Sequence, residues 1–192
     1  TTLYGTNYSR PPLLNWLIIA FANVLGWDHV LLASRIVTAG ATVTTGLVLA
    51  WLVFHLTRND NFAAFSAVVL LTGDALFYRG WLAYSDSLFT LCVFGAIACL
   101  WVCVHERRQA LVWLAVAALT CGFLAKVQTA YVFYGVAALA LSCNREYRRE
   151  LLHPNSVAAH LAAAIAFVAW HVLLTRGAQS SGTLVDILLK AQ

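Results

Sequence analysis

Two isolated cations, Arg10 and Lys126, stand at the edges of long apolar stretches of this chain. Arg10 precedes Pro11-Pro12, and a proline holds the residue before it extended, so the arginine is presented on a stiff segment. Lys126 is the only charged residue between Arg108 and Arg145. A cation at a membrane boundary is costly unless an anion or a water-filled cavity receives it. The pattern therefore favours a pocket for a lipid-linked phosphate, with an interfacial anchor (Arg10) and snorkelling to headgroups (Lys126) as the alternatives.

Polar residues elsewhere in the chain are candidates for lining the same cavity. Asp86 opens an apolar run, where a carboxylate either caps a helix N-terminus or positions a sugar hydroxyl or a cation such as Arg79. Asp74 lies inside an apolar stretch, so it is either a functional intramembrane carboxylate or a local partner of Arg79. Arg35 has a simple membrane anchor as its alternative. We predict that the cavity is lined by Asp86, Arg79, Arg35, Tyr84 and Asp74.

Several other kinds of chemistry find no support in the sequence. The six histidines show no metal-ligand spacing, and no phosphate loop, dinucleotide fingerprint or Ser-His-Asp pattern occurs. The five cysteines all fall inside apolar runs without a CxxC pair, which is typical of small packing residues. We name no cofactor and leave a divalent metal open. No basic run interleaved with aromatic residues occurs, so we expect no nucleic-acid partner.

The composition indicates the elements that must position these residues. Of the 192 residues, 61% are hydrophobic and 10% are charged, against about 25% charged in a soluble domain. We therefore predict an all-α, polytopic transmembrane helical bundle. Residues 13–25 would make a helix of only about 20 Å, against a hydrocarbon core of about 30 Å, which favours an interfacial helix over a short tilted span. The predicted spans are 35–57, 62–78, 85–104, 110–125, 128–143 and 157–175.

The distribution of cations predicts the orientation of this bundle. If the spans alternate, paired and tripled arginines gather on one side, at Arg58, Arg107-Arg108 and Arg145 to Arg149. Such clusters in short loops are typical of the cytoplasmic face, whereas the other side carries single cations. We predict one transmembrane module over residues 1–192, with 1–12 as the end of an external loop and six spans within 35–175. Because the chain starts at Thr1 and contains no methionine, we expect it to be an internal piece of a longer protein.

The segment Tyr8-Ser9-Arg10-Pro11-Pro12-Leu13-Leu14-Asn15-Trp16 resembles the Y-x-(K/R)-P-P-L-x-x-W signature of bacterial lipid-dependent glycosyltransferases. These are the aminoarabinose transferase and protein mannosyltransferase-like enzymes of the GT-C class. Three further pieces are similar in order and spacing. They are Ala33-Ser34-Arg35, Ser85-Asp86-Ser87-Leu88 and Gly122-Phe123-Leu124-Ala125-Lys126.

This resemblance implies an enzyme that takes a sugar from a polyprenyl-phosphate donor at the extracytoplasmic face and gives it to a lipid, protein or glycan acceptor. It implies that Arg10 and Lys126 hold the donor phosphate and that Asp86 lines the cavity. The catalytic base of the family is expected upstream of Thr1, so the piece alone should not catalyse. We expect a multi-pass protein of the bacterial inner membrane, with membrane lipid as a further partner. The alternative is a transporter or channel subunit in which Asp74, Arg79 and Lys126 line a solute path.

Overall fold

The computed structural model describes residues 12–73, 85–126 and 128–190, with side chains described as far as residue 173. Every regular element in these ranges is helical, which confirms the all-α class. The elements are α1 (Leu13–Leu25), the short 3-10 helix η1 (Trp27–His29), α2 (Val30–Thr57), α3 (Asp60–Thr72), α5 (Ser85–Glu106), α6 (Ala110–Lys126), α7 (Thr129–Ser142), α8 (Arg145–Leu151) and α9 (Pro154–Lys190).

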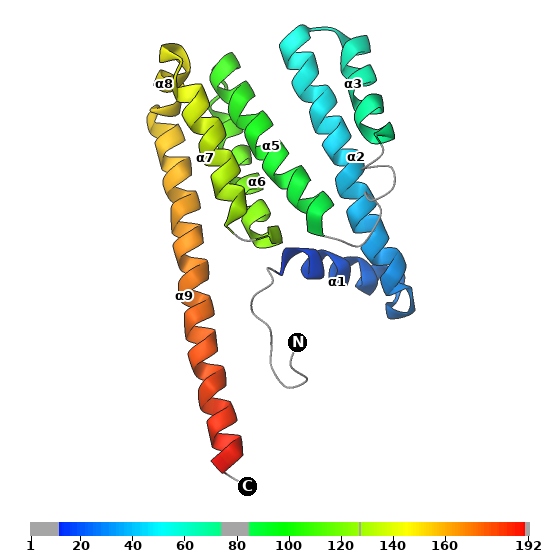
Figure 1. Cartoon of the computed structure of the whole chain (residues 1–192), viewed down its shortest axis with the longest axis vertical. Helices are drawn as coiled ribbons and strands as arrows, with labels where there is room; N and C mark the ends of the chain where they lie inside the picture. Colours follow the sequence, from blue (N-terminus) through cyan, green and yellow to red (C-terminus); the bar gives the residue numbers. More distant parts are fainter. Residues whose placement is uncertain (1–11, 74–84, 127, 191–192) are drawn as a thin grey trace.

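The longer helices run alternately up and down in the bundle, and α1 lies across one end of it (Figure 1). Three stretches are long and apolar enough to cross a membrane, namely Trp27–Thr57, Ser85–Glu106 and Pro154–Leu173. The helices α3, α6 and α7 are apolar but shorter. These features confirm a helical membrane bundle, and the number of six spans stays a prediction.

Several boundaries differ from those expected. The first span was expected from residue 35, but α2 begins at Val30, so Arg35 lies in the second turn of the helix. The last span begins at Pro154 rather than at 157, because proline is well suited to the first position of a helix. The connector after Cys143 contains α8, which was not predicted. This helix is started by Asn144, whose side chain accepts a hydrogen bond of 2.9 Å from the Glu146 amide.

The core of the bundle lies between α5 and its neighbours. Leu100 of α5 and Val112 and Leu119 of α6 are almost completely buried. Cys99 and Cys103 lie in the same cluster as small packing residues, in agreement with the sequence analysis. Small residues at a helix interface let the backbones approach closely, which explains why α5 is the most enclosed of the three long apolar helices.

The two ends of the bundle differ in charge. The connectors with Arg58, Arg107 and Arg108 lie at the same end as α8, which carries Arg145, Arg148 and Arg149 (Figure 1). We call this the arginine end. The opposite end, which we call the α1 end, holds α1, the start of α5 and the end of α6. The predicted gathering of clustered arginines at one end is therefore present, and its cytoplasmic location stays a prediction.

Thiol labelling tests this orientation. Cys143 is an exposed native thiol at the arginine end, and a Lys126→Cys variant places a second thiol at the α1 end. We expect a membrane-impermeant maleimide to label position 126 in intact cells and Cys143 only after permeabilisation. The other four cysteines are replaced by alanine, and the Cys143→Ala protein is the control. Labelling of Cys143 in intact cells would invert the orientation.

Candidate functional site

Two of the predicted site residues meet at the α1 end. Lys126 is the last residue of α6, Asp86 is the second residue of α5, and the lysine Nζ forms an ion pair with the aspartate Oδ1. Their side chains are 51% and 66% exposed, so the pair is open to its surroundings. The Nζ atom also lies 5.8 Å from the centre of the Phe89 ring. A cation and a carboxylate from two helices therefore share one accessible position, and their role as a ligand site stays a prediction.

The close packing of α6 explains why Lys126 reaches Asp86. A Cβ atom built on Gly122 would lie 3.3 Å from the Cβ atoms of both Cys92 and Ala130, on α5 and α7. These distances are tighter than ordinary Cβ contacts, so a side chain one turn before Lys126 would push the neighbouring helices apart by a few tenths of an ångström. The charges also suit their positions, because an acidic residue favours the first turn of a helix and a basic residue the last turn. Each residue of the ion pair thus also has a favourable interaction with the dipole of its own helix. The N-terminal role expected of Asp86 is compatible with its pairing to Lys126.

The helix α1 covers this end of the bundle. Leu13, Leu14 and Leu17 pack against a buried cluster that includes Leu88, two residues after Asp86, and Ala125, directly before Lys126. The Trp16 ring meets Trp170 of α9 edge to face, with ring centres 6.3 Å apart. The amide of Trp16 donates a 2.9 Å hydrogen bond to the Pro12 carbonyl. The proline motif therefore leads into a helix that is fixed beside the Asp86–Lys126 pair.

Of the remaining predicted site residues, the structure describes Arg35. Arg35 is exposed on α2, and its carbonyl accepts a 3.2 Å hydrogen bond from the Thr38 hydroxyl. Four predicted site residues lie outside the described residues: Arg10, Asp74, Arg79 and Tyr84. Phe89, one turn beyond Asp86, was not predicted as a neighbour of Lys126, although its spacing of three residues from Asp86 places it on the same side of a helix.

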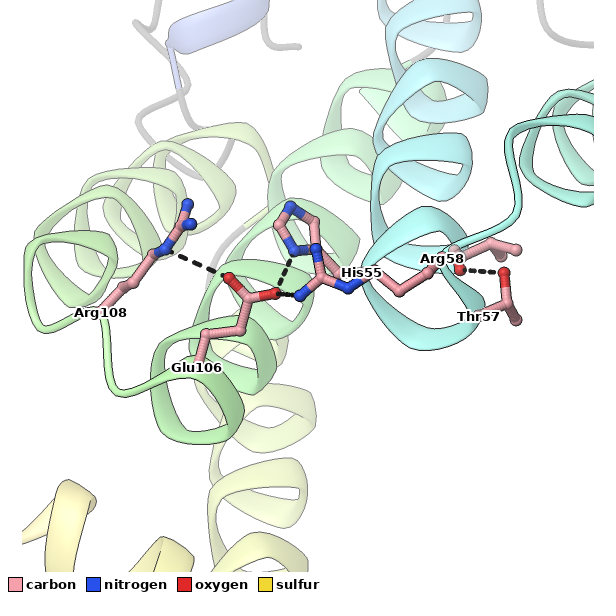
Figure 2. A network of polar contacts seen from close by, with 6 residues as sticks. His55, Thr57, Arg58, Glu106 and Arg108 are labelled. Atoms are coloured by element: carbon pink, nitrogen blue, oxygen red, sulfur yellow. Dashed lines mark hydrogen bonds and ion pairs between the residues drawn. The ribbon is translucent and has the colours of Figure 1, made fainter.

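A second polar cluster at the arginine end was missed by the sequence analysis (Figure 2). The Glu106 Oε1 atom lies 2.5 Å from His55 Nδ1 and 2.5 Å from Arg58 Nη2, and Oε2 lies 3.2 Å from Arg108 Nε. The Glu106 side chain is only 9% exposed. His55, to which the sequence analysis assigned no partner, contacts this nearly buried carboxylate. The available signal was Glu106 itself, an acid directly before two arginines at the end of a span.

The Glu106 cluster links the end of α2 to the end of α5 and to Arg108 in the connector that follows. It lies at the end opposite to the Asp86–Lys126 pair (Figure 1). Within residues 12–73, 85–126 and 128–173, no three His, Cys, Asp or Glu side chains come together as metal ligands would. At the α1 end, the Asp86–Lys126 pair brings a cation and a carboxylate together close to the residues that pack against α1.

The close approach at Gly122 can be tested directly. We expect Gly122→Leu to lower the free energy of unfolding by about 1–3 kcal/mol, because the larger side chain would force α6 away from α5 and α7. Thermal unfolding in detergent, followed by tryptophan fluorescence, measures the change. Gly135→Ala is the control, since a Cβ atom there would meet nothing within 4 Å. Equal melting of the Gly122→Leu variant and the wild type would contradict the packing.

Comparison with known families gives one match. A family model described as dolichyl-phosphate-mannose-protein mannosyltransferase matches residues 9–174. This range includes the proline motif from Ser9 onward, the whole of α1 to α8, and both Asp86 and Lys126. Comparisons with curated proteins and with solved structures gave no match.

Proposed function

The chain belongs to the dolichyl-phosphate-mannose-protein mannosyltransferase family of GT-C membrane glycosyltransferases, and we propose that it takes its sugar from a polyprenyl-phosphate donor. The acceptor in this proposal is a lipid, protein or glycan hydroxyl at the extracytoplasmic face of a bacterial plasma membrane. The single observation that supports the position of the site is the exposed Asp86–Lys126 pair at the α1 end. The family match favours this function over a transporter or channel subunit.

Lys126 is suited to hold the donor phosphate because its present ion pair is weak. Ion pairs between solvent-exposed side chains contribute only about 0–1 kcal/mol, so a phosphate group with a higher charge can compete for the ammonium. The lysine is a compact charge on a flexible stem, and it can turn from Asp86 to a ligand without any change in the helices. We assign Lys126 and Arg10 to the donor phosphate and Asp86 to the adjacent lining. Arg35, Asp74, Arg79 and Tyr84 remain proposed lining residues.

The proposed reaction is a displacement at the anomeric carbon of the sugar. The acceptor oxygen forms a bond to this carbon while the bond from the carbon to the phosphate oxygen breaks, and the polyprenyl phosphate leaves with the bonding electrons. The acceptor proton passes to a carboxylate that acts as the general base. Negative charge grows on the departing phosphate, so Lys126 and Arg10 stabilise the transition state more than the ground state.

A donor panel tests this proposal. The purified complete protein is incubated with polyprenyl-phosphate sugars and, separately, with the matching nucleotide sugars, and the products are identified by mass spectrometry. We expect sugar transfer from at least one polyprenyl-phosphate donor and none from nucleotide sugars. Transfer from a nucleotide sugar, with none from any polyprenyl-phosphate sugar, would contradict the proposed donor class.

A further inference from the structure

The short helix α8 presents a cationic outer face at the arginine end. Arg145, Arg148 and Arg149 are all exposed. The opposite face of α8 is attached to the bundle, because the Tyr147 hydroxyl lies 3.1 Å from His105 Nδ1 and Glu150 accepts a 2.7 Å hydrogen bond from Gln109. The contacts of the inner face thus fix the helix and leave the arginines pointing away from these partners.

The other arginines at this end form ion pairs with carboxylates, whereas the described structure shows none for the arginines of α8. Arg58 and Arg108 are paired with Glu106, and Arg107 lies 3.8 Å from Glu150. Among the residues that the structure describes, no carboxylate lies within ion-pair distance of Arg145, Arg148 or Arg149. Glu146 on the same helix forms no ion pair with them, so the three neighbouring arginines leave an excess of positive charge that attracts an external anion.

An apolar groove opens beside these charges. It has a volume of about 320 Å³ and lies between α7 and α9, against the end of α8. Val157 and Leu161, on its α9 side, are 40% and 58% exposed. The groove is lined by Ala138, Leu151, Val157, His160 and Leu161.

His160 does not make the groove polar, because both nitrogens of its ring have partners inside the protein. Its Nδ1 lies 2.7 Å from the Ser156 carbonyl, which can only accept, so this nitrogen carries the proton. The Nε2 atom is then the acceptor for the Tyr134 hydroxyl at 3.0 Å. With both nitrogens satisfied, the ring contributes an essentially apolar wall, which is suited to a hydrocarbon chain.

We propose that α8 and this groove form a binding site for an anionic glycerophospholipid of the adjoining leaflet. Arg145, Arg148 and Leu151 follow one another at intervals of three residues, so they share one side of α8, and Leu151 lines the groove. The phosphate group binds at Arg148 and Arg145, where guanidinium groups can form paired hydrogen bonds with its oxygens. One acyl chain lies in the groove between α7 and α9.

The position of α8 identifies a bilayer lipid as the occupant. Leu139 of α7 and Leu152, which follows α8, are 69% and 67% exposed. These residues belong to the apolar outer surface of the bundle, and the arginines lie where this surface ends, at the level of the headgroup phosphates. This inference does not depend on the proposed transferase function, because it concerns the opposite end of the bundle.

Native mass spectrometry of the complete, delipidated protein tests the charge requirement. The protein is titrated with phosphatidylglycerol and with phosphatidylcholine of the same acyl chains, and we expect tighter binding of phosphatidylglycerol. Arg148→Gln should weaken phosphatidylglycerol binding about fivefold to tenfold, as expected for loss of one close cation. Arg58→Gln is the matched control, because it removes the same charge at the arginine end but from the connector after α2, away from the groove between α7 and α9 (Figure 1), and it should change the affinity less than twofold. Equal binding of the two lipids, or equal loss in the two variants, would overturn the proposed site.

A second set of measurements tests the groove. Val157→Trp fills it from its exposed rim and should weaken phosphatidylglycerol binding while Arg145 and Arg148 remain in place. Unchanged thermal unfolding of this variant shows that the bundle is intact. A competition experiment with polyprenyl phosphate then distinguishes the two lipids. If an equimolar amount of polyprenyl phosphate displaces phosphatidylglycerol, and does so in the Arg148→Gln variant as well, the groove holds the donor chain and the phospholipid proposal is wrong.

Discussion

Replacing Lys126 by glutamine is expected to lower kcat/KM for sugar transfer by about 100-fold or more, the loss that follows removal of one donor that stabilises developing negative charge. Glutamine keeps a polar side chain of nearly the same reach at the end of α6 but carries no charge. The phosphate that leaves the sugar would then lose its nearest described cation. Initial rates with a polyprenyl-phosphate sugar, together with thermal unfolding of the variant, measure the effect. The same loss is expected for Arg10→Ala.

Two further variants separate phosphate binding from the ion pair with Asp86. Lys126→Arg keeps a positive charge and should retain part of the activity. Asp86→Asn removes the ion-pair partner but leaves the ammonium in place, so it should reduce kcat/KM much less than Lys126→Gln does. If Asp86→Asn and Lys126→Gln lower the activity equally, the lysine acts through the aspartate, and the proposed contact with phosphate is wrong.

Replacing Glu106 by leucine is expected to cause the largest loss of stability at the arginine end. The substitution leaves His55, Arg58 and Arg108 without their common carboxylate, and His55 is as little exposed as Glu106 itself, at 9%. The two arginine side chains are 60% and 64% exposed, so either one can return to water when it is changed alone. The apparent melting temperature should therefore fall more in Glu106→Leu than in Arg58→Gln or Arg108→Gln.

The control for this prediction is Glu106→Gln. Its amide oxygen can still accept a hydrogen bond from His55 or an arginine, while the negative charge is absent, so its melting temperature should lie between those of the wild type and Glu106→Leu. Thermal unfolding of all four variants in one detergent gives the comparison. Wild-type melting of Glu106→Leu would show that the cluster does not hold the end of α2 to the end of α5.

Local signals in the sequence were sufficient to predict much of the bundle. The helix over 13–25 has the bounds of its apolar run, because Pro12 precedes it and Gly26, with a φ of 96°, ends it. Short connectors imposed the alternation of the helices. Lys126 and Asp86 were expected at the same end for the same reason, and their helices proved to be packed against each other.

Features that depend on tertiary contacts could not be predicted in the same way. The Glu106 cluster requires that α2 and α5 end at the same level and side by side, and the apolar residues of these helices do not specify that they are neighbours. The helix α8 is only seven residues long and charged, so its stability comes from its contacts with His105 and Gln109 rather than from an apolar pattern. The roles of Arg10, Asp86 and Lys126 in donor binding stay predictions.

Protection of Lys126 from an amine-modifying reagent tests the central claim most directly. The chain contains two lysines, Lys126 and Lys190, so the second serves as an internal reference. The complete protein is modified with and without polyprenyl phosphate, and peptide mass spectrometry measures the rate at each lysine. The proposed site predicts that polyprenyl phosphate slows modification of Lys126 severalfold and leaves that of Lys190 unchanged. Equal rates at Lys126 with saturating polyprenyl phosphate and without it would contradict the claim that this lysine holds the donor phosphate.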